Sequence, residues 1–86
     1  MKFSPGNIVY SLAGRDSGKY FVVVSVIDNF AFICDGRSRK TDKPKKKKVK
    51  HLKECGHSDC IAQKIEKGEV ITNKELKSEL KPYAKP

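Results

Sequence analysis

The sequence predicts a mainly β domain, a small closed or nearly closed barrel with a short helical appendage at its C-terminus. Short runs of β-branched and aromatic residues alternate with tight-turn signals over the first half of the chain. The apolar residues cluster between Ile8 and Ile33, and helical patterns are confined to the part after His51. A chain of 86 residues has room for one domain.

Three strands are expected before the basic part of the chain, at residues 6–12 (GNIVYSL), 20–27 (YFVVVSVI) and 30–34 (FAFIC). The second is almost wholly β-branched or aromatic, which is the strongest strand signal present. A glycine-bracketed turn, GRDSGK at residues 14–19, separates the first two. In the third, alternation places Phe30, Phe32 and Cys34 on one face and Ala31 and Ile33 on the other.

The next segment is polar and then strongly basic. Asp35-Gly36 is a hairpin signal, so we expect a polar strand over residues 37–41. Pro44 has no N–H and should interrupt pairing, which leaves the lysines after it solvated. Val49 and Leu52 are the apolar anchors of this segment, and we expect them to hold a short closing strand.

Two short helices are expected in the C-terminal part. Ser58 is a suitable N-cap for the first, and Gly68 is a suitable stop. Thr72-Asn73-Lys74-Glu75 is a capping box for the second, which Pro82 should end. We therefore expect residues 1–53 to form the barrel with its basic segment, and residues 54–86 to form a helical extension.

Charge is concentrated in one segment. Residues 37–53 (RSRKTDKPKKKKVKHLK) contain ten of the 19 Lys and Arg residues and one acidic residue, Asp42, so they hold the whole net charge of +9. The other 69 residues contain nine basic and nine acidic side chains. A block of one sign beside a neutral, ordered sequence is typical of proteins that bind a polyanion, and RNA is the leading candidate.

Composition argues against several classes of protein. No run approaches the ~18 apolar residues of a membrane-spanning helix, and Pro5 and Gly6 interrupt the N-terminus before a signal peptide develops. Three cysteines, an odd number, make no disulfide framework, so we expect free thiols and a cytoplasmic protein, with Cys34 buried as a small hydrophobe. No catalytic Ser/His/Asp set, carboxylate pair or phosphate-cradling loop is evident, so neither an enzyme nor a cofactor is expected.

The stretch from Gly6 to Gly36 resembles a KOW domain, an SH3-like barrel of ribosomal proteins and transcription elongation factors. Its motif is a Gly-initiated strand (GNIVYSLAG), a basic turn, Gly18 and a run of valines. Residues 13–52 further resemble the large-subunit ribosomal protein fourteen-e family of archaea and eukaryotes and its bacterial relatives. The specific parts are GRDSGKYFVVV and KPKKKKVKHL. The resemblance implies an RNA-binding protein that acts in translation and that binds rRNA as a ribosomal or ribosome-associated protein. Composition indicates that it has no membrane partner.

The basic segment predicts contacts to phosphates rather than to bases. Lysines bind phosphate as point charges, and its eight lysines outnumber its two arginines. The GRDSGK turn adds a second basic cluster. We expect the protein to be a monomer. The candidate RNA-binding residues are Arg15, Lys19, Arg37, Arg39, Lys40, Lys43, Lys45, Lys46, Lys47, Lys48, Lys50 and His51.

Other interpretations stay open at this point. Gly14 and Gly18 either supply positive φ for a tight turn or let backbone N–H groups meet a phosphate. Tyr10 and Tyr20 either pack at the core or stack on bases. The lysine run either binds a polyanion, or is a solvated loop, or, as PKKKKVK, serves in nuclear localisation. The order H-x3-C-x-H-x2-C supplies four zinc-capable side chains, but in unusual spacing, so no metal is expected: His51, Cys55, His57 and Cys60.

Two rival functions belong to other classes. One is a protein-interaction KOW module of the transcription-elongation-factor type, in which an aromatic face of the barrel carries binding. The other is a nucleic-acid binder without specificity, which would bind duplex DNA and folded RNA equally well.

Overall fold

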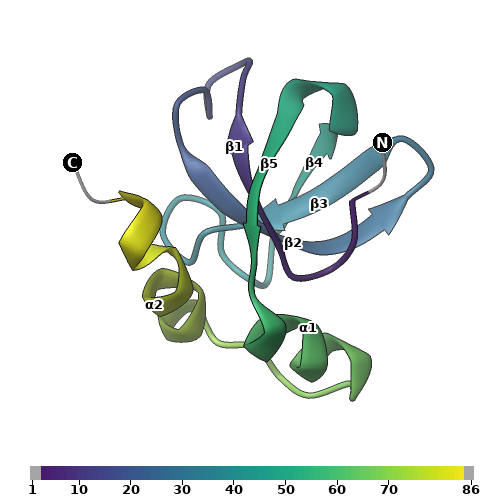
Figure 1. Ribbon diagram of the computed structural model, residues 1–86, viewed down its shortest axis with the longest axis vertical. Helices are drawn as coiled ribbons and strands as arrows, with labels where there is room; N and C mark the ends of the chain where they lie inside the picture. Colours follow the sequence, from purple (N-terminus) through teal and green to yellow (C-terminus); the bar gives the residue numbers. More distant parts are fainter. Residues whose placement is uncertain (1–2, 85–86) are drawn as a thin grey trace.

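Five strands form one antiparallel sheet in the computed structural model, which describes residues 3–84 (Figure 1). The strands are β1 (Asn7–Ser11), β2 (Tyr20–Ile27), β3 (Phe30–Cys34), β4 (Lys45–Lys48) and β5 (Leu52–His57). Two helices follow, α1 (Asp59–Glu66) and α2 (Asn73–Ala84). The mainly β class and the first three strands are confirmed. Residues 1–2 and 85–86, at the ends of the two expected regions, lie outside the described residues.

The strand order is β4-β3-β2-β1-β5, so the first four strands form a meander and the fifth returns to pair with β1. A 3₁₀ turn at Val49–His51 connects β4 to β5. Within residues 3–84, β4 and β5 are the two edges of the sheet, which is not closed by pairing between them. The register shifts between Ile8 and Val9 and between Val23 and Ser25, which interrupts the regular pairing there.

Both faces of the sheet are buried over much of β1, β2 and β3, which explains the nearly unbroken apolar run in β2. Phe21 and Val23 belong to an inner core enclosed by the curved sheet, together with Phe3, Val9, Ala31, Ile33 and Leu52. Val22 faces the other way, into an outer core between the sheet and the helices, with Ile8, Cys34, Ile61, Leu76 and Leu80. The alternation predicted for β3 is confirmed, because Cys34 lies in the outer core and Ala31 and Ile33 in the inner one.

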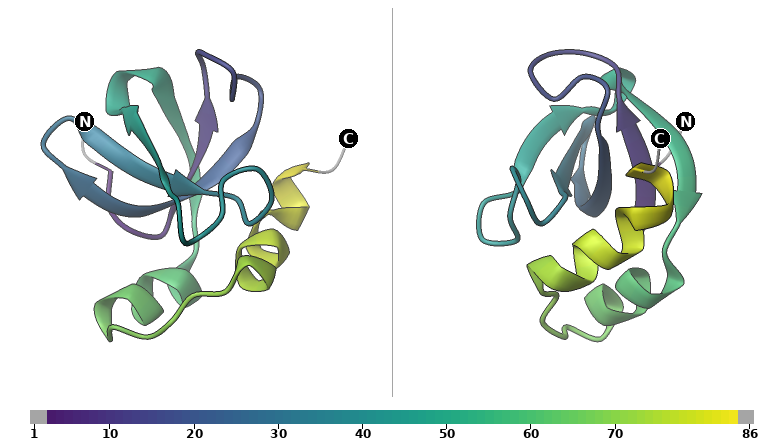
Figure 2. Two further views of the ribbon diagram at one scale, coloured as in Figure 1. Left: turned by 180° about the vertical axis from the view of Figure 1, so that it is seen from behind. Right: turned by 90° about the vertical axis from the view of Figure 1, so that its left-hand side faces the viewer.

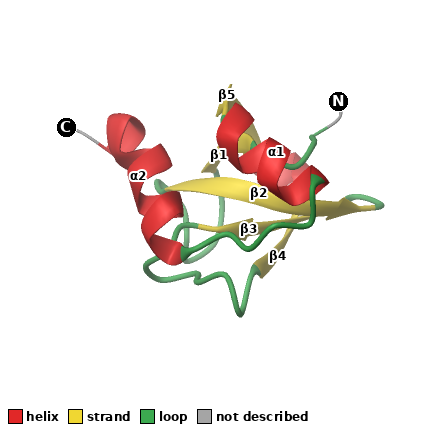
Figure 3. Ribbon diagram, turned by 90° about the horizontal axis from the view of Figure 1, so that it is seen from below, coloured by secondary structure: helices red, strands yellow, loops and turns green. Residues whose placement is uncertain are grey.

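The helices lie beneath the sheet in Figure 2, and Figure 3 shows them from below, on one face of the sheet. They pack against the sheet through the outer core. Ser58 caps α1 as predicted, because its hydroxyl accepts the Ile61 N–H at 3.2 Å. The capping box of α2 is also confirmed: Glu75 accepts the Thr72 N–H at 2.9 Å, and Thr72 Oγ1 accepts the Glu75 N–H at 3.1 Å. The prediction that Pro82 ends α2 is wrong. Pro82 lies inside the last turn, where one missing N–H interrupts little pairing.

The prediction of a polar strand over residues 37–41 is also wrong. The Asp35 carboxylate accepts the backbone N–H groups of Arg37 at 2.9 Å and Arg39 at 2.8 Å, which curls these residues around one side chain. The fourth strand is instead the lysine run after Pro44. The closing strand, β5, begins at Leu52 and continues to His57, so the helical part begins at Asp59.

The end of α2 approaches β5 closely because residue 56 is glycine. A Cβ atom at Gly56 would overlap the hydroxyl of Tyr83 and lie 3.0 Å from its Cζ. Gly56 is therefore required for the position that the Tyr83 ring takes over the edge strand.

Candidate nucleic-acid interface

The GRDSGK turn is built on a glycine conformation and a buried carboxylate. Gly18 has φ +86°, as its turn role predicts. Asp16 is buried and accepts hydrogen bonds from Arg39 Nε at 3.3 Å and Nη2 at 3.0 Å. Arg15 and Lys19 point outward and are exposed. Of the predicted RNA-binding residues in and around this turn, Arg39 therefore has a partner within the protein, whereas these two are solvated.

Asp35 organises the loop between β3 and β4. Besides the two backbone N–H groups, its carboxylate accepts the hydroxyl of Ser38 at 3.1 Å. The loop presents three exposed basic residues from the predicted set: Arg37, Lys40 and Lys43. The carboxylate at the base of this loop is thus already satisfied and does not need a cation from them.

The four lysines of β4 point alternately to two sides. Lys45 and Lys47 are half-buried and pair with the inner-core residues Ile33 and Ala31. Lys47 Nζ donates to the carbonyl oxygen of Ala13 at 2.7 Å. Lys46 and Lys48 are exposed, and Lys46 Nζ lies 4.3 Å from the centre of the Phe30 ring, a cation–π contact.

The expectation that the whole lysine run is solvated is therefore wrong. A lysine stem packs on apolar surface while its ammonium group reaches solvent or a carbonyl, so four lysines are compatible with an edge strand. Beyond β4, Lys50 is exposed and His51 is half-buried in the 3₁₀ turn. The carbonyl oxygen of His51 accepts the Leu12 N–H at 2.8 Å, which holds this turn against the end of β1.

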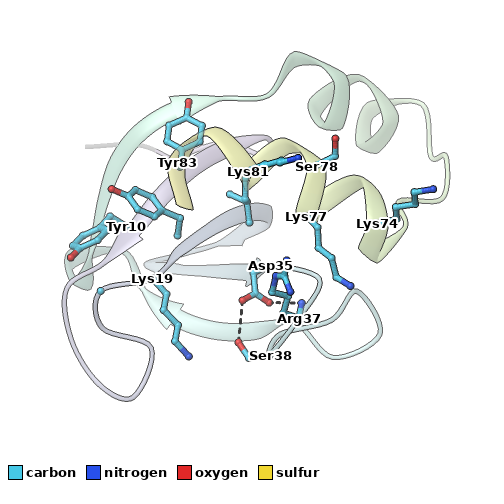
Figure 4. A pocket seen from close by; sticks show the side chains of 13 residues that line it. Tyr10, Lys19, Asp35, Arg37, Ser38, Lys74, Lys77, Ser78, Lys81 and Tyr83 are labelled. Carbon is cyan, nitrogen blue, oxygen red and sulfur yellow. Dashed lines mark hydrogen bonds between the residues drawn. The ribbon is translucent and has the colours of Figure 1, made fainter. Parts of the chain in front are cut away.

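An open groove of about 1060 Å³ lies between α2 and the ends of β1, β2 and β3. Five basic residues line it, two from the predicted set and three from α2: Lys19, Arg37, Lys74, Lys77 and Lys81. Among the described lining residues, Asp35 alone is acidic. Figure 4 shows Tyr10 and Tyr83 near one end of the groove and Lys74 at the other, with Lys77 and Arg37 in between.

Sequence reasoning missed the lysines of α2 because acidic residues balance them along the chain. In the folded protein, the acidic and basic side chains of α2 lie on different sides of the helix. Glu75 binds Lys64 of α1, and Glu79 Oε1 accepts the hydroxyl of Ser58 at 2.6 Å, so both acids point toward α1. Lys74, Lys77 and Lys81 recur at helical spacing on the groove side. This helical spacing is the sequence feature that could have indicated a basic helix face. A count of net charge over the whole segment does not reveal it.

Tyrosines form the aromatic end of the groove. The Tyr10 and Tyr20 rings have centroids 5.0 Å apart at 58°, and those of Tyr20 and Tyr83 are 5.8 Å apart at 43°. All three rings are half-buried. Tyr20 and Tyr83 also pack against the outer core, which fixes their positions in the groove wall.

The histidines and cysteines of the H-x3-C-x-H-x2-C pattern do not come together as a group that could hold a metal ion. Cys34 is buried as predicted; burial, and next the charges of Asp35 and Asp42, raise the pKa of its thiol to about 11. Cys55 and Cys60 are exposed. The Asn7 side-chain amide donates to His57 Nδ1 at 3.1 Å. Within residues 3–84, no group of three or more His, Cys, Asp or Glu side chains is placed to hold a metal ion.

The chain matches no protein-family model and no curated protein sequence. Neither helix in the described part of the chain is long and apolar enough to cross a membrane.

Proposed function

We propose that this protein binds RNA through contacts to the phosphate backbone. The observation that carries the proposal is the ordered display of cations by the segment of residues 37–53. Seven of its basic side chains are exposed on the loop, β4, the 3₁₀ turn and the start of β5: Arg37, Lys40, Lys43, Lys46, Lys48, Lys50 and Lys53. The same segment contains a single acid, Asp42. Such a surface binds a polyanion by releasing its counterions.

Lysine predominates on this surface, which favours contacts to backbone rather than to base edges. Arg39 and Lys47 already bind Asp16 and the Ala13 carbonyl, so they contribute mainly to the architecture of the surface. Arg15 and Lys19 extend the surface from the GRDSGK turn. Folded RNA, recognised by its shape and phosphate path, suits this arrangement.

The same proposal includes a specific fold type and a cellular context for the RNA binding. The meander of β1–β4, the 3₁₀ turn and the return of β5 to β1 support an SH3-like KOW barrel with an open seam. In that case the protein is a non-enzymatic, cytoplasmic monomer that binds large-subunit rRNA, in or on the ribosome.

The test is the salt dependence of binding to a folded RNA hairpin, measured by fluorescence anisotropy. Lys46 and Lys48 are the residues to change, because Lys45 and Lys47 are half-buried. Changing Lys46→Gln and Lys48→Gln together should reduce the slope of log affinity against log salt by roughly 1.4–1.8, since each phosphate contact contributes about 0.7–0.9.

Lys67→Gln is the control, because Lys67 is an exposed lysine at the end of α1, outside the basic segment. It should leave the slope unchanged. The control removes one charge and the β4 variant removes two, so a control effect half as large as that of the variant would show that only net charge matters. A wild-type protein that does not bind the hairpin would refute RNA binding altogether.

A further inference from the structure

We propose that the groove between α2 and the sheet binds an unpaired RNA strand, with bases stacked on the tyrosines and phosphates on the basic side chains. This inference rests on the proposed function and assigns part of it to a site outside the basic segment. It also predicts a preference for unpaired RNA. A surface that contacts only phosphates would instead accept a duplex as readily as a single strand.

The aromatic end of the groove has the properties of a stacking platform. Aromatic side chains bind single-stranded nucleic acid through the faces of successive bases, without regard to base identity. Tyr20 and Tyr83 are anchored on the outer core, and Tyr10 lies against Tyr20 with ring centroids 5.0 Å apart. Anchored rings lose little conformational freedom when a ligand binds, which favours affinity.

The rest of the groove supplies the charge that a phosphate chain needs. Lys77 and Lys81 lie on the wall formed by α2, and Lys19 and Arg37 lie opposite, on the turn and the β3–β4 loop. Asp35 between them already accepts three hydrogen bonds from the protein. Its negative charge is therefore partly compensated, and the five surrounding cations leave the groove positive.

The dimensions fit a short strand. From Lys74 to Tyr83 the helix advances about 14 Å at 1.5 Å per residue, long enough for about four nucleotides at the ~3.4 Å spacing of stacked bases and for fewer where the strand is extended. Bases in a duplex are stacked on each other and cannot lie on a protein ring, whereas unpaired bases can be splayed onto it.

The chain provides its own optical probe of this groove. It has three tyrosines and no tryptophan, and all three tyrosines line the groove. We would titrate the full chain with a uridine oligomer of about ten nucleotides, following tyrosine fluorescence, and in parallel with a folded RNA hairpin lacking a single-stranded tail. The oligomer should quench tyrosine emission at saturation, and the hairpin should bind with at least threefold less quenching.

Tyr10→Leu should weaken binding of the uridine oligomer about tenfold, because stacking on one ring is lost, and affinity for the hairpin should change less than twofold. Tyr10→Phe keeps the ring and should recover most of the lost affinity. A second variant, Lys77→Gln with Lys81→Gln, changes exposed side chains that the fold does not need. It should weaken binding of the oligomer several-fold even if Tyr10→Leu proves unstable.

Three results would overturn the inference while RNA binding itself stands, as judged by anisotropy of the labelled hairpin. The first is equal quenching by the hairpin and the oligomer. The second is an unchanged affinity for the oligomer in both groove variants. The third is tighter binding of an oligoglutamate peptide than of the oligomer, which would assign the groove to an acidic protein segment. Absence of hairpin binding would instead refute the proposed function.

Discussion

Arg39 donates to both carboxylate oxygens of Asp16, a residue 23 positions earlier in the chain. The pair fastens the β3–β4 loop to the GRDSGK turn, two segments that together present Arg15, Lys19, Arg37 and Lys40. The Asp16 side chain is 5% exposed and that of Arg39 is 29% exposed. The geometry of the basic surface therefore depends in part on an ion pair that is itself largely withdrawn from solvent, alongside the hydrogen bonds that Asp35 accepts in the loop.

Arg39→Ala should reduce the free energy of unfolding by about 2 kcal/mol, because it leaves the Asp16 carboxylate buried without its partner. Urea unfolding followed by circular dichroism measures this. Arg15→Ala, one residue from Asp16 and exposed, is the matched control and should change stability by less than about 0.5 kcal/mol. Equal effects of the two substitutions would mean that the ion pair does not stabilise the turn.

Gly56→Ala should loosen the end of α2. The new methyl group overlaps the Tyr83 hydroxyl, and overpacking of this kind costs about 1–3 kcal/mol. Faster hydrogen exchange of the α2 amides, with β2 amides unchanged, is the expected signature. Combining Gly56→Ala with Tyr83→Phe removes the overlapping hydroxyl and should recover part of the loss. If the destabilisation by Gly56→Ala and that by Tyr83→Phe are additive in the double variant, overlap with the Tyr83 hydroxyl is not the cause of the loss.

The thiols should fall into two classes. With its pKa raised to about 11, Cys34 is about one-thousandth thiolate near pH 8, and it is also buried. A thiol-reactive disulfide reagent should therefore modify Cys55 and Cys60 quickly in the folded protein and Cys34 only after unfolding in guanidinium. Rapid modification of all three cysteines in the native state would contradict the position of Cys34 in the outer core.

The ion pair between the helices should make stability depend on pH. The Lys64 ammonium, and next the Thr72 N–H, hold the pKa of Glu75 below its ordinary value of 4.5. A lowered pKa in the folded state means that stability from this group is present above the ordinary value and is lost as the pH falls through the lowered one. The same hydrogen bond raises the pKa of Lys64, so its contribution is lost only above the ordinary lysine value of 10.5.

Lys64→Met should therefore flatten the decline of unfolding free energy in acid, between about pH 5 and pH 3. Lys67→Met removes the same charge from the end of α1 without touching Glu75 and should preserve the decline. Unfolding by urea at a series of pH values provides the comparison. If the unfolding free energies of the two variants decline equally in acid, the ion pair is not the cause of the pH dependence.

The parts of the fold that were predictable from sequence are those with local signals. The β-branched run of β2, the Ser58 cap and the Thr72–Glu75 capping box each depend on neighbouring residues, and each is confirmed. The β4 strand was not predictable in this way. Four lysines have low strand propensity. They form a strand because their backbone pairs with β3 and because the half-buried stems of Lys45 and Lys47 tolerate contact with apolar surface.

The candidate site was predictable only in part. The sequence pointed to Lys19 and Arg37, and both line the groove. It did not point to Lys77 or Lys81, because Glu75 and Glu79 neutralise them in any count along the chain. Only the docking of α2 against α1 turns those acids away from the groove. Tyr83 joins Tyr10 and Tyr20 through the same docking, across a sequence separation that no local pattern spans.

The lysines of β4 also bear on how copies of this protein behave toward one another. An edge strand offers unpaired backbone groups that a second molecule can extend, which is a common start of aggregation. Here two identical edges would have to bring eight ammonium groups together, four from each copy. Their mutual repulsion opposes such association, so the lysines that make this edge cationic also oppose polymerisation of the free protein through β4.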